Sequence, residues 1–170
     1  GRGHAAEEVA AKQFNGELVE ELELQYKDID LIIPSVKGDC TYTVSVKDQT
    51  YSTGKGFKTV QIELELRDTL TGDTMQGCFY SNESDYYFWR VIFEGDDIWV
   101  IVKSKVLKTY IHNNRDSLTQ WHTTENTNKR NKDLGRKFNS SRGVTMAIED
   151  LISLGAVREV ELCTVRASRR

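Results

Sequence analysis

Strictly alternating apolar and polar positions predict β-strands in the first two thirds of the chain. In residues 41–47 (TYTVSVK), apolar side chains occupy one face and polar side chains the other. A short apolar run, DIDLII, precedes this segment, and Pro34 and then Gly38-Asp39 supply turn chemistry between the two. We therefore predict a β-hairpin over residues 28–49.

The same pattern predicts further strands. Residues 57–67 alternate cleanly, and the dense apolar stretch 85–111 contains two strands around a Gly-Asp turn, followed by a short helix that we expect Ser104 to cap. A last strand is expected at 157–166. The aromatic residues of the dense stretch are expected in the core more than on a base-stacking surface: Tyr86, Tyr87, Trp89 and Trp99.

Helical spacing predicts two helices outside this region. Residues 4–14 are Ala-rich and close with Asn15-Gly16, and residues 144–156 are amphipathic and end at Gly155. The first helix is expected to bury one face, formed by Ala6, Val9, Ala10 and Phe14.

Some segments give weaker signals. Residues 17–27 fit either a helix end or an extended lead-in, with an alternation that hints at a strand. Residues 50–58 are rich in Gly, Ser and Thr and predict a flexible loop, and residues 68–77 predict a turn region. Residues 112–142 hold few apolar positions and predict a long polar loop.

The length of 170 residues fits one domain with a sizeable core. The net charge of −3 is unevenly distributed, because residues 1–112 carry 12 basic and 19 acidic side chains while residues 113–142 carry 7 basic and 3 acidic ones. A basic segment on an acidic body favours phosphate contacts, although solvated polar loops have similar compositions. The candidate nucleic-acid contacts are Lys55, Lys58, Lys129, Arg130, Lys132, Arg136, Lys137 and Arg142.

Cysteine usage and hydropathy bear on the compartment. The three cysteines are widely spaced and form no CxxC pair, which favours reduced thiols and an intracellular, cytoplasmic protein. No secretory leader is visible, and no apolar run reaches the ~20 residues of a membrane helix, so no membrane partner is expected.

Candidate chemistry gathers on the predicted hairpin. Asp28 and Asp30 enter its first strand, and Ser45 and Lys47 share the polar face of its second strand. A carboxylate that faces a lysine across a hairpin is able to hold a divalent metal ion while the ammonium orients a water molecule.

These residues resemble the motif of the PD-(D/E)-x-K nucleases, the superfamily of restriction enzymes and archaeal Holliday junction resolvases. Asp30 matches the motif's Asp, Lys47 its Lys, and Gln49 a polar residue that often follows. The departure is Ser45, which stands where the motif has Asp or Glu. Some restriction enzymes with Ser-Val-Lys take the missing carboxylate from a Glu elsewhere in the fold.

The first helix resembles that of the resolvase-like branch, in which Glu7 is the matching acidic residue and Glu8 a close rival. Glu7 and Glu8 also suit a helix N-terminus without any function. The resemblance implies that Asp30 and Glu7 bind Mg²⁺, with Mn²⁺ as a substitute, and that Lys47, Ser45 and Gln49 assist catalysis. Glu63 is a second candidate for the missing carboxylate, if residues 57–67 pair with 41–47.

The resemblance implies an α/β fold, a restriction-endonuclease-like mixed β-sheet flanked by helices, with a basic C-terminal extension. It divides the chain into a nuclease-like core (1–112), a basic polar loop (113–142) and a helix-strand extension (143–170) that packs on the core or at an oligomer interface. It further implies a Mg²⁺-dependent endonuclease acting on DNA as a homodimer or tetramer. Two alternatives stay open: a catalytically degenerate nucleic-acid-binding module, and a structural protein whose Ser-Val-Lys is accidental.

Overall fold

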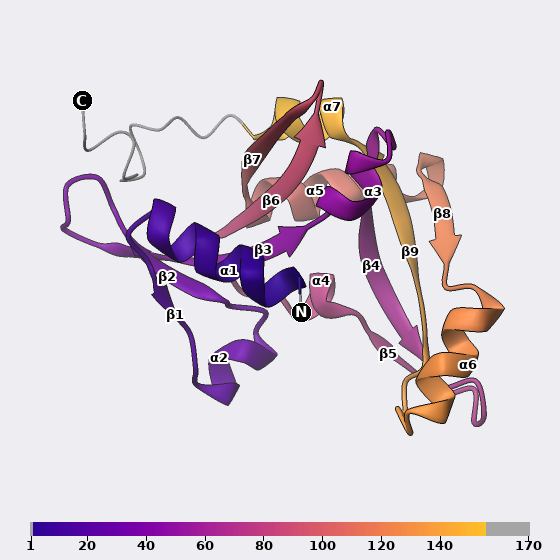
Figure 1. Ribbon diagram of the computed structural model, residues 1–170. Helices are drawn as coiled ribbons and strands as arrows, with labels where there is room; N and C mark the ends of the chain where they lie inside the picture. Colours follow the sequence, from indigo (N-terminus) through magenta and orange to yellow (C-terminus); the bar gives the residue numbers. More distant parts are fainter. Residues whose placement is uncertain (1, 156–170) are drawn as a thin grey trace.

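Two β-sheets form the centre of the computed structural model, which describes residues 2–155, without the side chains of residues 2, 3, 125 and 126 (Figure 1). One sheet has the strand order β1-β2-β3-β6-β7 and the other β5-β4-β9-β8. The first sheet consists of β1 (Glu17–Leu18), β2 (Leu31–Pro34), β3 (Thr41–Asp48), β6 (Tyr86–Phe93) and β7 (Asp96–Lys103). The second consists of β4 (Thr59–Arg67), β5 (Thr74–Gln76), β8 (Thr119–His122) and β9 (Ser140–Ala147). The mixed α/β class is confirmed.

The predicted hairpin is confirmed as the antiparallel pair β2–β3, in which Leu31 lies opposite Val44. Beyond it, β3 pairs in parallel with β6, so that Lys47 lies opposite Trp89. The two predicted strands of the dense stretch form the antiparallel pair β6–β7. Both faces of β3 are covered, since Val44 and Val46 are buried on the side of α1 and even Ser45 on the polar face is fully buried.

Helix α1 (Arg2–Gln13) covers one face of the first sheet (Figure 1). Ala6 and Ala10 are fully buried, and the Phe14 ring packs edge-on against Phe88 at 4.7 Å between centroids. The expected face is wrong at one position, since Val9 is 38% exposed. The buried contacts of α1 with the sheet are made by Ala6, Ala10 and Phe14. The chain turns back towards β1 at Asn15, whose φ is +56°.

Strand β4 confirms the predicted strand but not its expected partner. It pairs with β5 and β9 in the second sheet, whereas β3 pairs with β2 and β6. Its apolar residues Val60, Ile62 and Leu64 pack against the first sheet, beside Tyr87 and Trp89. The polar face of β3 is therefore covered by a second layer, which the alternation in β3 alone did not reveal.

The predicted polar loop of residues 112–142 is wrong, because this segment contains β8, helix α6 (Glu125–Asp133) and the start of β9. Two polar contacts explain the order in so polar a sequence. The Thr124 hydroxyl accepts a hydrogen bond from the Thr127 N–H and caps α6. The Trp121 indole N–H donates to the Val144 carbonyl, which ties β8 to β9.

The C-terminal helix is shorter than predicted. Helix α7 is Ile148–Leu154, because residues 144–147 pair with β4 as part of β9. Ile148 and Leu151 bury themselves in the core, so this unit packs on the rest of the chain. The expected strand 157–166 lies outside the described residues.

Three shorter segments also differ from expectation. Residues 17–27 form both β1 and helix α2 (Leu22–Tyr26), so the alternation that hinted at a strand lies in a helix. Residues 50–58 contain helix α3 (Thr50–Gly54), and residues 68–77 contain β5. Short helix α4 (Cys78–Ser81) follows β5. The formation of α3 in a segment rich in Gly, Ser and Thr is explained by Thr53. Its side chain is buried, and its hydroxyl donates a hydrogen bond to the Gln49 carbonyl at 2.7 Å.

Helix α5 (Ser104–Asn114) is confirmed, but Ser104 does not cap it. The capping position is Lys103, without a side-chain hydrogen bond, and the Ser104 hydroxyl instead lies 3.0 Å from that of Ser84. None of the helices within residues 2–155 is long and apolar enough to span a bilayer.

Candidate functional site

A buried ion pair lies where β3 meets α4. The Lys47 ammonium donates to both carboxylate oxygens of Asp28, each at 2.9 Å, and the two side chains are only 22% and 12% exposed. Asp28 follows α2 in a left-handed conformation, with φ of +57°. This conformation costs about 1 kcal/mol in a non-glycine residue, so the turn that presents Asp28 to Lys47 is stabilised by these contacts.

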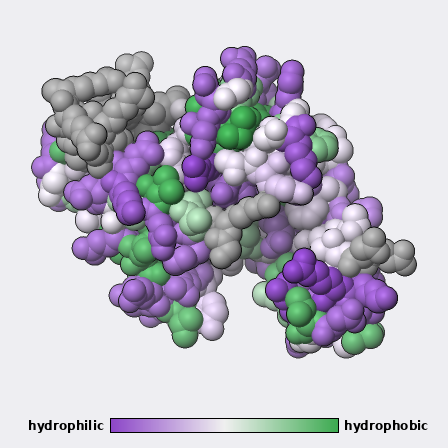
Figure 2. Space-filling view, in the orientation of Figure 1, coloured by the Kyte–Doolittle hydropathy of each residue, from purple (hydrophilic) through white to green (hydrophobic). Residues whose placement is uncertain are grey.

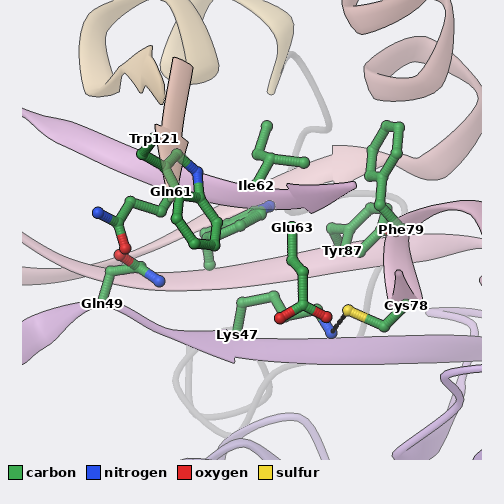
Figure 3. Close-up of a pocket in the computed structure, with 10 residues that line it drawn as sticks. Lys47, Gln49, Gln61, Ile62, Glu63, Cys78, Phe79, Tyr87 and Trp121 are labelled. Carbon is green, nitrogen blue, oxygen red and sulfur yellow. Dashed lines mark hydrogen bonds between the residues drawn. The ribbon is translucent and has the colours of Figure 1, made fainter. Parts of the chain in front are cut away.

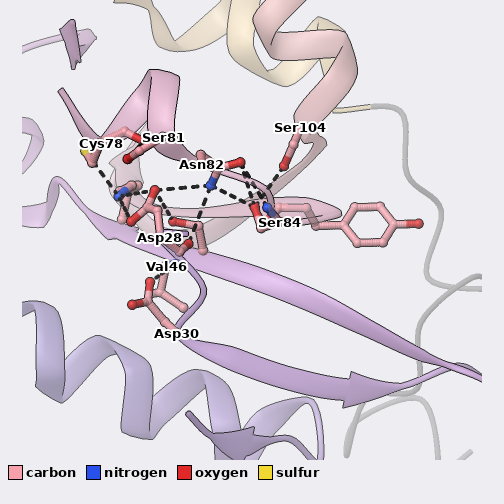
Figure 4. Close-up of polar contacts among 11 residues, drawn as sticks. Asp28, Asp30, Val46, Cys78, Ser81, Asn82, Ser84 and Ser104 are labelled. Atoms are coloured by element: carbon pink, nitrogen blue, oxygen red, sulfur yellow. Dashed lines mark hydrogen bonds and ion pairs between the residues drawn. The ribbon is translucent and has the colours of Figure 1, made fainter. Parts of the chain in front are cut away.

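Asp28 has two further partners on the same face (Figure 4). The Ser45 hydroxyl donates to it at 2.8 Å and the Asn82 amide at 3.1 Å. Asn82 is itself buried and also contacts Ser84, while the Lys108 ammonium donates to the Asn82 carbonyl. Ser45 thus holds the Asp28 carboxylate in place through its hydroxyl.

The surroundings of Lys47 keep its ammonium charged. Burial lowers the pKa of Lys47, but the charge of Asp28, its hydrogen bonds to the ammonium and the charge of Asp30 raise it, and the net pKa lies above the ordinary value. The ammonium also donates to the Cys78 sulfur at 3.7 Å. Burial in turn raises the pKa of the Cys78 thiol, which is therefore neutral at pH 7.

Asp30 lies in a different environment from Asp28, on the other side of Val46 (Figure 4). Its carboxylate accepts a hydrogen bond from the Val46 N–H at 2.7 Å. Burial nevertheless raises the pKa of Asp30 to about 7, and the nearby Glu7 charge adds to this effect more than Lys47 opposes it. Two carboxylates that repel each other in a partly dry site attract a cation.

Glu63 reaches the same site from the second sheet. Figure 3 shows its carboxylate beside Lys47 and Cys78. Burial raises the pKa of Glu63, while Lys47 and the Cys78 N–H partly offset that rise. The register of β4 against β9 shifts between Glu63 and Glu65, a bulge of the kind that redirects a side chain.

The carboxylates around β3 meet only part of the requirements for binding a hard divalent metal ion. Within residues 2–155, no three His, Cys, Asp or Glu side chains gather closely enough to form a ready-made metal site. Mg²⁺ needs less, since it commonly takes one or two protein carboxylates and completes its shell with water and substrate phosphate. Asp30 and Glu7 satisfy that requirement, whereas both oxygens of Asp28 are already hydrogen-bonded.

A pocket of about 260 Å³ lies between the two sheets, next to Lys47 (Figure 3). We call it the intersheet pocket. Its aromatic walls come from α4, β6 and β8, and are Phe79, Tyr87, Trp89 and Trp121. Its polar groups come from β3, β4, α4 and the residue between β3 and α3, and include Lys47, Gln49, Gln61, Glu63 and Cys78. Figure 3 shows the Gln49 and Gln61 amides facing each other at one end.

Two polar atoms of the pocket walls are unsatisfied. Neither the Tyr87 hydroxyl nor the Trp89 indole nitrogen has a hydrogen-bond partner in the described part of the chain. Both residues are deeply buried, at 1% and 3% exposure. A buried unsatisfied donor costs about 1–3 kcal/mol, so two of them in one pocket call for a physical explanation.

The predicted phosphate-contacting residues do not form one surface. Lys55 and Lys58 lie where β4 begins, and the Lys55 ammonium rests 4.0 Å from the Tyr51 ring centroid. Helix α6, with Lys129, Arg130 and Lys132, lies at the other end of β4 (Figure 1), roughly 30 Å away for a strand of nine residues.

Figure 2 shows a mostly hydrophilic lobe around α6, at the lower right. Two of its basic side chains have partners within the chain, since Arg136 donates to Asn131 and Arg142 pairs with Glu65. Lys137 lies over the Phe138 ring. The α6 lobe is thus the larger of two separate basic regions.

Several residues of the site carried no local signal. Asp28 was visible as half of an acidic pair, but its contact with Lys47 depends on a left-handed turn. Asn82 lies 54 residues further along the chain, and Cys78 lies 31 residues beyond Lys47. No periodicity or motif links positions so far apart.

No family model matches the sequence, and neither a curated protein nor a solved structure is significantly similar to it. What the site does must therefore follow from its geometry and its charges.

Proposed function

We propose that this protein is a Mg²⁺-dependent endonuclease that hydrolyses DNA phosphodiester bonds at the β2–β3 hairpin. One observation carries the proposal: β3 holds a lysine–aspartate ion pair on one face, while Asp30, bound to the Val46 N–H of the same strand, lies near the Glu7 charge and within the electrostatic reach of Lys47. The ion pair supplies a fixed cation for a phosphate, and the other two carboxylates supply oxygen ligands for a metal ion. The order of helix α1 followed by the β2–β3 hairpin, and a sheet with both parallel and antiparallel pairs, also fit the mixed sheet that the resemblance implies.

Each residue has a distinct role in this proposal. Asp30 and Glu7 would hold Mg²⁺ or Mn²⁺, which when bound would supply positive charge to the scissile phosphate and lower the pKa of a water molecule. Lys47 holds the attacking water or the extra negative charge of the five-coordinate phosphorus. Asp28 fixes the position of the Lys47 ammonium through two hydrogen bonds, and Ser45 fixes Asp28.

The nucleic acid is held by charge away from the reaction centre. The α6 lobe carries Lys129, Arg130 and Lys132 on exposed positions, and DNA affinity should fall steeply with salt as these side chains displace counterions. An enzyme that cuts both strands of a duplex needs two such centres, so we propose a homodimer or tetramer as the active form.

The test is cleavage of supercoiled plasmid and of a four-way junction with Mg²⁺ or Mn²⁺. Lys47→Met and Asp30→Asn should each lower the rate by at least about 100-fold, because each removes a charge that acts on the phosphate. Lys37→Met and Asp73→Asn are matched controls on exposed turns and should cut as wild type does. Cleavage that survives both site substitutions would overturn the assignment of the centre.

One observation favours a second candidate, a nuclease fold that binds nucleic acid without cutting it. Both Asp28 oxygens are engaged by Lys47, Ser45 and Asn82, so the carboxylate nearest to Lys47 has little capacity left for a metal ion. In that case, DNA would bind with a strong salt dependence and remain intact in Mg²⁺ and in Mn²⁺.

A further inference from the structure

An acidic surface with exposed apolar side chains is formed by residues 17–26, which contain β1 and α2. The segment holds four glutamates and no basic residue, and all four glutamates are exposed: Glu17, Glu20, Glu21 and Glu23. Leu22 is 64% exposed and Tyr26 is 76% exposed, and their spacing of four residues places them on one side of α2. We call this surface the α2 face. Large apolar side chains gathered at such exposure are typical of an interaction surface.

The α6 lobe has the opposite charge. Residues 125–137 carry five basic and two acidic side chains, a net charge of +3, whereas residues 17–26 carry a net charge of −4. The five basic side chains are exposed: Lys129, Arg130, Lys132, Arg136 and Lys137. Opposite charges steer two surfaces towards each other and penalise contact between surfaces of the same sign. The α2 face and the α6 lobe are therefore complementary in charge.

Exposed apolar side chains also lie beside the basic residues. Leu134, at the end of α6, is 58% exposed, and Leu70, in the turn between β4 and β5, is 79% exposed. Asn139 holds that turn against α6, since its side chain accepts a hydrogen bond from the Thr69 hydroxyl at 2.9 Å and its carbonyl accepts one from the Asn131 amide. The α6 lobe, with this turn, thus combines charge and apolar surface as the α2 face does, with the sign of the charge reversed.

The two surfaces lie apart in one molecule, and their placement suits a pair of molecules related by a two-fold axis. Figure 1 shows α2 at the lower left and α6 at the lower right, along the same edge of the molecule, and Figure 2 shows apolar side chains among hydrophilic ones at both places. A second copy, rotated by 180° about an axis perpendicular to this view and placed below the first, presents its α6 lobe to the α2 face and its α2 face to the α6 lobe. One rotation therefore satisfies both contacts, as in an isologous interface.

We propose that two copies of this chain associate reciprocally, with the α2 face of each copy docked on the α6 lobe of the other. Tyr26 and Leu22 pack against Leu134 and Leu70 at the centre of each contact, and the glutamates around them face the basic side chains of α6. Each surface is small, so one contact alone is weak, and two contacts in the same dimer strengthen each other. The contacts do not depend on the proposed function. Since DNA is proposed to bind the same lobe, this dimer is a resting form, distinct from the assembly proposed for cleavage.

The test is an exchange of charges between the two surfaces, measured by sedimentation velocity without DNA or metal ions. One variant, Glu20→Lys/Glu21→Lys, reverses the α2 face, and the other, Lys129→Glu/Lys132→Glu, reverses the α6 lobe. All four side chains are exposed, and the Glu21 side chain forms no capping hydrogen bond with α2. Wild type should form a species of twice the monomer mass at about 100 µM in low salt, and should lose it as the salt approaches about 0.5 M.

Each variant alone should have a dissociation constant at least about tenfold higher than wild type, because like charges then face each other in both contacts. An equimolar mixture of the two variants should regain the dimer, because opposite charges again face each other in both contacts. Tyr26→Ala tests the apolar centre and should also raise the dissociation constant at least about tenfold, without lowering thermal stability, since the ring is exposed in the single chain.

Two control variants change the net charge by the same amounts at exposed positions elsewhere. Glu149→Lys/Asp150→Lys lies in α7, and Lys103→Glu/Lys105→Glu lies where β7 meets α5. Both controls should dimerise as wild type does. Controls that dissociate as the reversed variants do would overturn the inference, because the effect would then follow from net charge alone.

Three other outcomes would also overturn it. The first is a wild-type chain that stays monomeric at about 100 µM in low salt. The second is a mixture of the two reversed variants that does not dimerise. The third is a species that grows beyond twice the monomer mass, because it would show open head-to-tail chains instead of a reciprocal pair. None of these outcomes concerns plasmid cleavage, which tests the proposed function separately.

Discussion

Asp30→Asn isolates the electrostatics of the proposed metal site with a minimal structural change. The Asn side-chain oxygen is able to accept the hydrogen bond that the Val46 N–H now donates to Asp30. Only the ionisable proton and the negative charge are lost. The substitution therefore reports on the cost of holding a charged carboxylate beside Glu7.

The size and sign of the effect follow from the raised pKa. Burial, followed by the Glu7 charge, raises the pKa of Asp30 from 3.8 to about 7. The folded chain then keeps a proton that the unfolded chain releases between about pH 4 and pH 7, so this carboxyl group lowers wild-type stability as the pH rises through that window. A pKa difference of about 3 corresponds to up to about 4 kcal/mol. Asp30→Asn lacks this loss and should be more stable than wild type at pH 8.

Urea unfolding between pH 4.5 and pH 8 measures this difference. The gap in unfolding free energy between Asp30→Asn and wild type should grow with pH and level off above pH 7. Addition of Mg²⁺ at pH 8 should stabilise wild type, by about 1.4 kcal/mol at ten times the dissociation constant, and should stabilise the variant less. Asp73→Asn, on an exposed turn, should show neither effect.

A constant gap between pH 4.5 and pH 8 would refute the reasoning, because it would mean that Asp30 ionises with an ordinary pKa. An Asp30→Asn variant that is less stable than wild type at pH 8 would show that the carboxylate charge is stabilised by its surroundings. Equal stabilisation of both proteins by Mg²⁺ would place the ion elsewhere.

Three further substitutions test the packing around the site. Lys47→Met should destabilise the fold by about 3–5 kcal/mol in urea unfolding, since it leaves the buried Asp28 charge unpaired, and adding Asp28→Asn should recover at least half of that loss. Gly143→Ala should lower the free energy of unfolding by about 3 kcal/mol or more in thermal unfolding, because the new Cβ would lie 1.8 Å from a carbonyl oxygen of β4. Gly54→Ala is its control, since the new Cβ would make only an ordinary contact, and it should change stability by less than about 1 kcal/mol. Tyr87→Phe should leave stability unchanged or raise it by about 1 kcal/mol in the same assay, because it removes a buried hydroxyl without a partner.

The hairpin and the long strands were predictable because their signal is local. Alternation in residues 41–47 and 59–67 depends only on the strand period of two, and the Glu94-Gly95 turn, with φ of +51° and +84°, has the positive φ values of a tight hairpin connection. The grouping of an aspartate and a lysine on one hairpin also follows from short-range spacing. These features set the fold class and the place of the candidate centre.

The predicted polar loop failed because composition does not record long-range pairing. Residues 119–122 form a strand because they pair with β9, and α6 is stabilised by the cap at Thr124. The same limit explains why the C-terminal helix is shorter than predicted. Residues 144–147 have a helical pattern, but they pair with β4 and belong to β9.

Only the tertiary structure decided which carboxylate Lys47 contacts and what covers the polar face of β3. Asp28 and Asp30 look equivalent in the sequence, yet the left-handed turn at Asp28 places it on Lys47, and Asp30 lies on the other side of Val46 with Glu7. The intersheet pocket has no sequence signature, because it forms where a second sheet packs over the first. Local periodicity determined the strands of this protein, and the packing of distant segments determined its site, because burial, charge pairing and cavities depend on neighbours that the chain brings together only when it folds.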